Sequence, residues 1–264
     1  MNKNFFNEKL RVVGQQFSQF MINLHDMFEL FGRSFALLFN RPAYFRDTLA
    51  QMHSIGVRSL PIVVLVCTFT GMVLALQAGY AMAIYGAKMY VGSLVSISLL
   101  RELGPVLTAV VVAGRVGAGI AAEIGSMQVT EQIDAMRALG TNPVKKLSST
   151  RLVAILIMLP ILTFIGNGVG ILGALLIAVG NLNIAGSFFW TTVFNAITFE
   201  DLLNSLLKPI AFAMIISTIG CFMGFHASGG TKGVGEATTR SVVVSIVLIF
   251  LVDFLITNFI LTIS

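Results

Sequence analysis

Charged residues are scarce in this sequence. Only 11% of the 264 residues are Asp, Glu, Lys or Arg, whereas hydrophobic residues make up 56%. A soluble domain usually has about a quarter charged residues, because its surface must be hydrated. The composition therefore excludes an ordinary soluble globular protein and a disordered chain, and it favours an all-α, polytopic membrane protein.

Cysteine and histidine are also sparse. The two cysteines, Cys67 and Cys221, both fall in apolar stretches, which argues against a disulfide scaffold and against a thiol-based metal site. The three histidines, His25, His53 and His226, are scattered, and no nucleophile–base pair accompanies them. We therefore expect no metal site and no catalytic residue in this chain.

Long uncharged stretches divide the chain. Residues 59–87, 152–199 and 209–231 contain no charged residue, and Asp253 is the only one after Arg240. About 20 consecutive apolar residues cross a bilayer as a helix, and runs without period-2 alternation do not fit barrel strands. Five membrane spans are predicted, at 59–84, 90–114, 152–179, 203–225 and 239–261.

The basic residues fall almost entirely on one side of these spans. Fourteen Lys and Arg residues precede the first span or lie in the second and fourth connections, and one, Lys88, lies in the first connection. The positive-inside rule then places the N-terminus in the cytoplasm and the C-terminus outside. The net charge of +5 is accordingly assigned to loops that face anionic lipid, and no basic stripe with interleaved aromatics indicates nucleic-acid binding.

The start of the chain lacks the continuous apolar core of a signal peptide and has helical periodicity over residues 5–39. This pattern favours a helix in the membrane interface, the alternative being a partner-docking helix of a soluble domain. We therefore divide the chain into an interfacial helix with an elbow, residues 1–57, and one transmembrane domain, residues 58–264. The apolar face of the helix consists of Leu10, Val13, Phe17, Phe20, Leu24, Phe28, Phe31 and Phe35.

Four charged residues fall inside predicted spans, where an isolated charge is costly and therefore indicates a functional site. Two of them, Arg101 and Glu102, are adjacent and point about 100° apart on a helix, so each needs a partner on another span. We expect Glu102 to pair with Lys208 and Arg101 to pair with Asp253. Such a cluster serves either as a cavity for a charged head group or as ion pairs that hold helices together.

Glycine patterns concern packing more than nucleotide binding. Small residues four apart, at 166–170 and 220–224, predict close helix contacts in a membrane. The G-x-G-x-x-G pattern at 168–173 lies inside a span with no strand before it, and the glycine-rich loop 228–233 lacks P-loop spacing. No ATP site is therefore expected in this chain.

The connection after the second span predicts a short amphipathic helix on the cytoplasmic side. Apolar residues recur at near-helical spacing from Ile124 to Leu139, while Glu131, Asp134 and Arg137 lie three apart on a polar side. A glycine and a proline follow as stop signals. The helix either rests on the bilayer surface or receives force from a separate ATPase.

Six short motifs carry a resemblance to a known family. They read RELGPVLT at 101–108, AGRVG at 113–117, AAEIGSM at 121–127, TEQIDAM at 130–136, ATTR at 237–240 and DF at 253–254. Together they resemble the MlaE-type permease family, over about residues 40–262 and most densely at 99–151. The first 40 residues match only as an amphipathic lead-in.

The resemblance implies a permease subunit of an ABC transporter that moves phospholipid between the inner membrane and the outer envelope of a Gram-negative bacterium, a task linked to outer-membrane lipid asymmetry. It implies a homodimer, a separate cytoplasmic ATPase that uses the ATP, and an MCE-domain lipid-binding protein on the periplasmic side. No cofactor would be bound by this chain itself.

The same resemblance assigns candidate site residues. A cytoplasmic helix at about 117–140 would dock on the ATPase, and its polar residues are Glu123, Glu131, Asp134 and Arg137. Five charged residues match family positions on the lipid path or at helix junctions: Arg101, Glu102, Lys208, Arg240 and Asp253. Tyr85 matches an aromatic residue at the outer end of the first span.

Two further questions stay open at this point. Trp190 and the Phe residues of 181–200 favour a periplasmic interfacial helix over a re-entrant segment.

The alternative function is an autonomous secondary transporter or channel for a small solute, with the buried charges as a proton relay. A membrane enzyme ranks below both.

Overall fold

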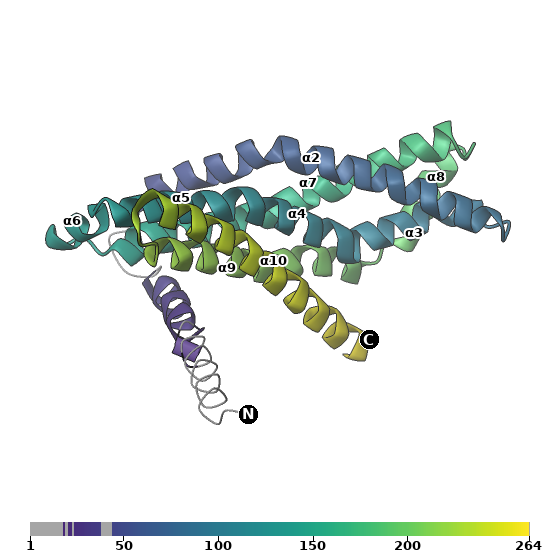
Figure 1. Ribbon diagram of the computed structural model, residues 1–264. Coiled ribbons are helices and arrows are strands. Elements are labelled where there is room, and N and C mark those ends of the chain that lie inside the picture. The colour runs from purple at the N-terminus through teal and green to yellow at the C-terminus, as the bar shows by residue number, and fades with distance from the viewer. Residues whose placement is uncertain (1–17, 19–20, 23, 38–43, 264) are drawn as a thin grey trace, which may run out of the picture.

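The computed structural model describes residues 18, 21–22, 24–37 and 44–263. Within these residues the chain is helical and contains no strand, as predicted (Figure 1). Five helical segments are long and apolar enough to cross a membrane: Phe45–Ala83, Lys88–Val129, Val144–Gly180, Phe199–Phe225 and Gly230–Thr262. The five predicted spans are therefore confirmed, and each helix begins before the apolar stretch that the sequence marks.

Three spans are unbroken α-helices, and two contain wider turns. The unbroken helices are α2 (Phe45–Ala83), α9 (Phe199–Phe225) and α10 (Gly230–Ile263). The second span consists of a 3-10 turn (Lys88–Tyr90), α3 (Val91–Ser98), α4 (Gly104–Val112) and α5 (Ala118–Val129), with π-helical turns at Leu99–Leu103 and Ala113–Gly117. The third consists of a π-helical segment (Val144–Ser149) and α7 (Thr150–Gly180).

Glycines allow the spans to approach closely. Helices α2 and α7 share the most extensive helix contact in the described structure. A Cβ atom on Gly71 of α2 would overlap the backbone carbonyl of Gly170 on α7, and Gly166 faces α2 one turn earlier. Gly220 and Gly224 approach the second span in the same manner, with a Cβ on Gly220 only 3.2 Å from the backbone carbonyl of Gly117. The predicted role of these glycines in helix packing is confirmed.

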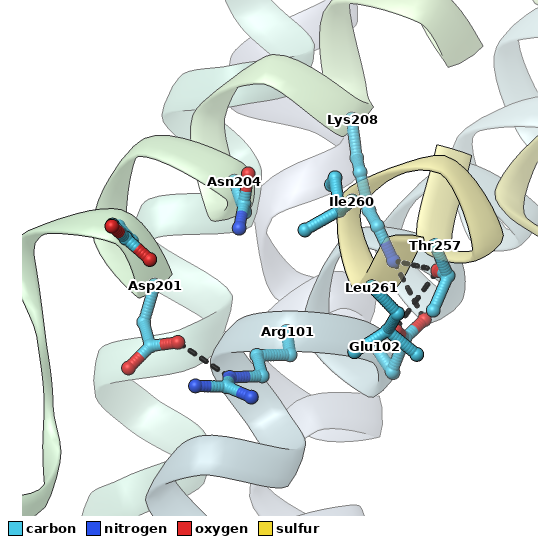
Figure 2. Close-up of a pocket in the computed structure, with 9 residues that line it drawn as sticks. Arg101, Glu102, Asp201, Asn204, Lys208, Thr257, Ile260 and Leu261 are labelled. Atoms are coloured by element: carbon cyan, nitrogen blue, oxygen red, sulfur yellow. Dashed lines mark hydrogen bonds and ion pairs between the residues drawn. The ribbon is translucent and has the colours of Figure 1, made fainter. Parts of the chain in front are cut away.

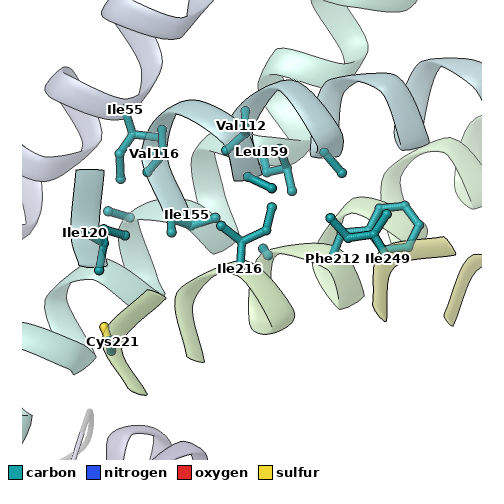
Figure 3. Packing of buried hydrophobic residues seen from close by; sticks show 14 of the residues in the cluster. Ile55, Val112, Val116, Ile120, Ile155, Leu159, Phe212, Ile216, Cys221 and Ile249 are labelled. Carbon is teal, nitrogen blue, oxygen red and sulfur yellow. The ribbon is translucent and has the colours of Figure 1, made fainter. Parts of the chain in front are cut away.

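An apolar core fills the space between the spans. Figure 3 shows Val112, Ile155 and Ile216, which come from α4, α7 and α9 and are fully buried. Ile55 of α2 and Ile249 of α10 belong to the same cluster, so every span contributes to one core.

The N-terminal helix is described over residues 24–36 and contacts the start of the third span. The hydroxyl of Ser34 lies 2.8 Å from that of Ser148, and the Ser149 hydroxyl donates to the backbone carbonyl of Ser34 at 2.8 Å. Its apolar residues Leu24 and Phe31 line a groove against α9 and α10. The first four residues of the predicted apolar face lie outside the described residues, and the placement of this helix in the membrane interface stays a prediction.

The connection at 117–140 is not one continuous helix. Helix α5 extends the second span to Val129, and a separate helix, α6 (Gln132–Ala138), follows. The break arises at Glu131, whose φ of 58° is left-handed and interrupts the helical hydrogen-bond ladder. Helix α6 lies at one end of the bundle, beyond α5 (Figure 1).

The helix predicted from the aromatic residues after the third span lies at the opposite end of the bundle. This helix, α8 (Gly186–Ala196), buries Phe189 and Val193 against α3 and neighbouring residues. The Ser93 hydroxyl of α3 donates to the carbonyl of Thr192 at 3.0 Å. The helix predicted here is therefore present. The location of α8 at the periplasmic surface of the membrane stays a prediction.

Replacing Gly71 by Ala should destabilise the bundle. The added methyl group would collide with the α7 backbone, which cannot move without separating α7 from α2. Overpacking of this kind costs about 1–3 kcal/mol. We expect a lower thermal unfolding midpoint in detergent.

Gly168→Ala on α7 is the matched control, because a Cβ there meets no atom within 4 Å. It should leave the midpoint unchanged or raise it slightly, since Ala favours a helix over Gly. Equal midpoints for the two variants would contradict close α2–α7 packing.

Candidate functional site

The π-helical turn at Leu99–Leu103 positions the adjacent charges of the second span. Pro105 has no N–H to donate to the carbonyl of Arg101, and its ring would crowd that carbonyl in a regular helix. The backbone N–H of Gly104 instead reaches back five residues to the carbonyl of Leu99. The helix is therefore locally widened at Arg101 and Glu102, and their side chains contact different helices.

Lys208 of α9 is the centre of one group of contacts (Figure 2). Its side chain is only 2% exposed, and its Nζ donates to Glu102 Oε2 at 2.7 Å and to the Thr257 hydroxyl at 2.8 Å. Nζ also lies 2.9 Å from Asp253 Oδ1, and Thr257 donates to Glu102 Oε1 at 3.0 Å. The predicted Glu102–Lys208 pair is thus present, and it is extended by two residues of α10.

Arg101 pairs with a different carboxylate from the one predicted. Its Nε donates to Asp201 Oδ1 at 2.5 Å (Figure 2), whereas Asp253 lies 2.9 Å from Lys208 Nζ. Asp201 is fixed at the start of α9 by a capping box, in which its carboxylate accepts from the backbone and hydroxyl of Thr198. The predicted Arg101–Asp253 pair is therefore wrong, because the capping carboxylate already lies beside the guanidinium.

These contacts surround a cleft between the second, fourth and fifth spans (Figure 2). It is small and partly open, with a volume of about 60 Å³. Its lining residues are Arg101, Glu102, Glu200, Asp201, Asn204, Lys208, Thr257, Ile260 and Leu261. Both charge signs line it, with apolar side chains of α10 on one side, so it suits a small charged group attached to an apolar one.

Two predicted site residues do not join this cluster. Arg240 lies 13 residues before Asp253 on α10, about 20 Å away at 1.5 Å per residue, and is exposed near Glu236 at 3.8 Å. It lines a separate cleft with His226. Tyr85 is exposed in the turn after α2 and does not line the charged cleft.

The four residues predicted to contact an ATPase fall into two groups. Glu123 lies on α5, and its carboxylate is 2.7 Å from Nη2 of the buried Arg151 on α7, so it ties two spans together. Asp134 and Arg137 are exposed on α6 and pair with each other at 2.9 Å. Glu131 is exposed at the break before α6, whose buried residue is Ile133.

Two residues that contact Arg101 or Lys208 were not predicted from the hydropathy of the sequence. Asp201 falls just before the predicted fourth span, and its signal is the Thr198-x-x-Asp201 capping pattern. Thr257 is four residues after Asp253, on the same helix face, but a threonine in an apolar run is seldom distinctive.

One group of potential metal ligands was also missed, since His25 is not isolated. His25, Asp26 and Glu29 of the N-terminal helix bring ligand atoms within 4.8 Å of one another. Glu29 also lies 2.5 Å from Arg33, one turn further on. This solvated group is an ordinary polar helix surface in the described part of the chain.

Lys208→Met should destabilise the protein more than Glu102→Gln does. The methionine would leave two carboxylates, Glu102 and Asp253, facing each other without a cation, whereas Gln in place of Glu102 leaves Lys208 paired with Asp253. Removing one partner of a buried ion pair costs about 3–5 kcal/mol. We expect the lower thermal midpoint in detergent for Lys208→Met, and the reverse order would contradict the central position of Lys208.

Comparison with known proteins places the chain in a family. The model of a family described as Permease MlaE matches residues 48–259. A probable ABC transporter permease protein of Rickettsia typhi is 42% identical over 217 residues, 82% of this chain and 84% of the relative.

Two further relatives have more specific names. The protein TRIGALACTOSYLDIACYLGLYCEROL 1, chloroplastic, of Arabidopsis thaliana is 37% identical over 216 residues, 82% of this chain and 62% of the relative. The intermembrane phospholipid transport system permease protein MlaE of Haemophilus influenzae is 35% identical over 240 residues, 88% of this chain and 92% of the relative. With its five apolar helices and a family match over most of its length, this chain is a multi-pass membrane protein that belongs to the MlaE permease family.

Proposed function

We propose that this chain is the membrane-spanning subunit of an ABC transporter that moves phospholipid between the inner membrane and the outer envelope of a Gram-negative bacterium. Membership of the permease family supports transport, and the name of the Haemophilus relative supports phospholipid as cargo. The observation that carries the proposal is the cleft of ionised side chains inside the span bundle.

The cleft has the chemistry that a phospholipid head group requires. A guanidinium such as that of Arg101 binds phosphate oxygens through charge-assisted hydrogen bonds. Ile260 and Leu261 of α10 offer apolar contact beside it, where acyl chains leave the head group. The exposed side chains of Leu255 and Phe259 on the same helix offer further apolar contact.

Helix α6 is the proposed contact with a separate ATPase. It protrudes at the end of the bundle with Asp134 and Arg137 exposed, and it follows directly from the span that carries Arg101 and Glu102. The sequence contains no motif of a nucleotide-binding loop. In our proposal the partner subunit therefore uses the ATP, and this chain binds no cofactor. The permease is accordingly not an enzyme itself.

Further partners and the orientation belong to the same proposal. The chain forms a homodimer whose two clefts share the lipid path, with an MCE-domain protein on the periplasmic side. The apolar surface of α10 supports a second copy, because its most apolar stretch is the least buried of the five spans. The basic connections support a cytoplasmic N-terminus and a periplasmic C-terminus.

Affinity purification from native membranes in mild detergent tests the proposed assembly. We expect an ATPase subunit, an MCE-domain protein and phospholipid to co-purify with the tagged permease. Reversing the charges of the α6 pair, Asp134→Arg with Arg137→Asp, should reduce ATPase recovery, because it keeps their mutual attraction but inverts the surface offered to a partner. Mass spectrometry measures both.

Glu236→Gln on α10 is the control, since it changes the charge of another exposed carboxylate–arginine pair. It should leave ATPase recovery unchanged. A permease that purifies without an ATPase, and that transports in response to a proton gradient alone, would instead support an autonomous secondary transporter.

Glu102→Gln should slow lipid transfer by the reconstituted complex at least severalfold. The change keeps the side-chain shape, yet it removes a charge that Lys208 and Thr257 both contact. Hydrogen bonds to a charged group are worth about 1.5–3 kcal/mol, so the polar cleft should lose its arrangement. Transfer of fluorescent phospholipid between vesicles measures the rate, and a wild-type rate would show that the cluster is only structural.

A further inference from the structure

The two cations of the cleft are not equally available to a ligand. Lys208 is 2% exposed, and its ammonium already has Glu102, Thr257 and Asp253 as partners within 2.9 Å. Two of its three protons are donated to Glu102 and Thr257, and the Asp253 carboxylate lies beside it, so a phosphate could approach only by displacing these partners. Lys208 therefore holds helices together, and a bound anion must rely on Arg101.

The guanidinium of Arg101 has hydrogen-bond donors that no described residue uses. Its side chain is 48% exposed, and Nε makes the contact with Asp201. Its two terminal nitrogens have no hydrogen-bond partner among the described residues. Arg101 therefore presents a half-accessible guanidinium fork that suits phosphate oxygens.

Carboxylates are the other accessible charges. Glu102 remains 38% exposed despite its contacts, and Glu200 on the first turn of α9 lines the cleft and is exposed. Glu200 has no ion-pair partner in the described structure. The accessible part of the cleft thus offers one cation and two anions.

The whole cluster has an excess of negative charge. Two cations, Arg101 and Lys208, face four carboxylates, those of Glu102, Glu200, Asp201 and Asp253. With all of them ionised the excess is two negative charges. In a low-dielectric setting this excess opposes a ligand of net negative charge.

We propose that the cleft prefers a zwitterionic phospholipid head group with a terminal ammonium, such as phosphoethanolamine, over an anionic one. The phosphate binds the free nitrogens of Arg101, and the ammonium binds the accessible carboxylate of Glu200. This inference rests on the proposed function and adds the class of head group. Glu200 is its specificity-determining residue, since its charge is not used elsewhere in the described fold.

Site-specific photo-crosslinking separates lipid in the cleft from lipid around the protein. p-Benzoylphenylalanine replaces Leu261, which lines the cleft, or Phe69, which is 58% exposed on α2 and serves as the bulk reference. The complex, with the subunits that co-purify, is reconstituted in vesicles of equal phosphatidylethanolamine and phosphatidylglycerol. Mass spectrometry of the adducts then gives the head-group ratio at each site.

We expect more phosphatidylethanolamine at Leu261 than at Phe69. Glu200→Gln should lower the ratio at Leu261 about threefold, the effect of one solvent-accessible ion pair. Asp47→Asn is the matched control, because Asp47 is likewise an exposed acid in the first turn of a span, and it should keep the wild-type ratio.

The outcomes distinguish this inference from the proposed function. Equal ratios at the two sites, or an unchanged ratio in Glu200→Gln, would overturn the head-group preference while phospholipid binding stands. Phospholipid adducts at Phe69 with none at Leu261 would overturn both.

Discussion

The buried ammonium of Lys208 constrains the rest of this structure. Removing a charge from water costs several kcal/mol even after relaxation, and an apolar span cannot supply that energy without hydrogen-bond partners. The partners come from two other spans, Glu102 from the second and Asp253 with Thr257 from the fifth. Three helices are consequently held in one relative position, and the cleft exists because this position leaves Arg101 beside it only partly covered.

A second, apolar interaction complements this polar one. Helices α2 and α7 meet through glycines, and no ion pair joins these two helices in the described structure. The second, fourth and fifth spans contain the ion pairs of Arg101 and Lys208 and the cleft beside them.

Hydropathy was sufficient to predict the architecture, but side-chain partners depended on details that it does not contain. The five spans, the α8 helix and the glycine contacts follow from long apolar runs, aromatic residues and spacing. The Glu102–Lys208 pair could be predicted because both charges are costly in a membrane and few partners exist. The partner of Arg101 could not, because Asp201 lies in a capping box that sits at the edge of the apolar run.

Helix continuity was equally hard to predict. The left-handed backbone at Glu131 separates α5 from α6, yet glutamate rarely adopts that conformation and the apolar spacing continues across it. Glu123 consequently belongs to the span and contacts Arg151, away from the exposed pair on α6. Arg240 was grouped with the intramembrane charges by family position, whereas the length of α10 separates it from them.

The π-helical turn at Leu99–Leu103 also sets the rotational phase of the second span. A wide turn is equivalent to one residue inserted into an α-helix, which offsets the two flanking faces by about 100°. Helix α3 can therefore direct one stripe toward α8, while α4 directs another toward α7 and α9. A single inserted residue thus lets α3 reach α8 and α4 reach α9 while both keep their contact with α2 and α7, and its loss would misalign the contacts on one side of the turn.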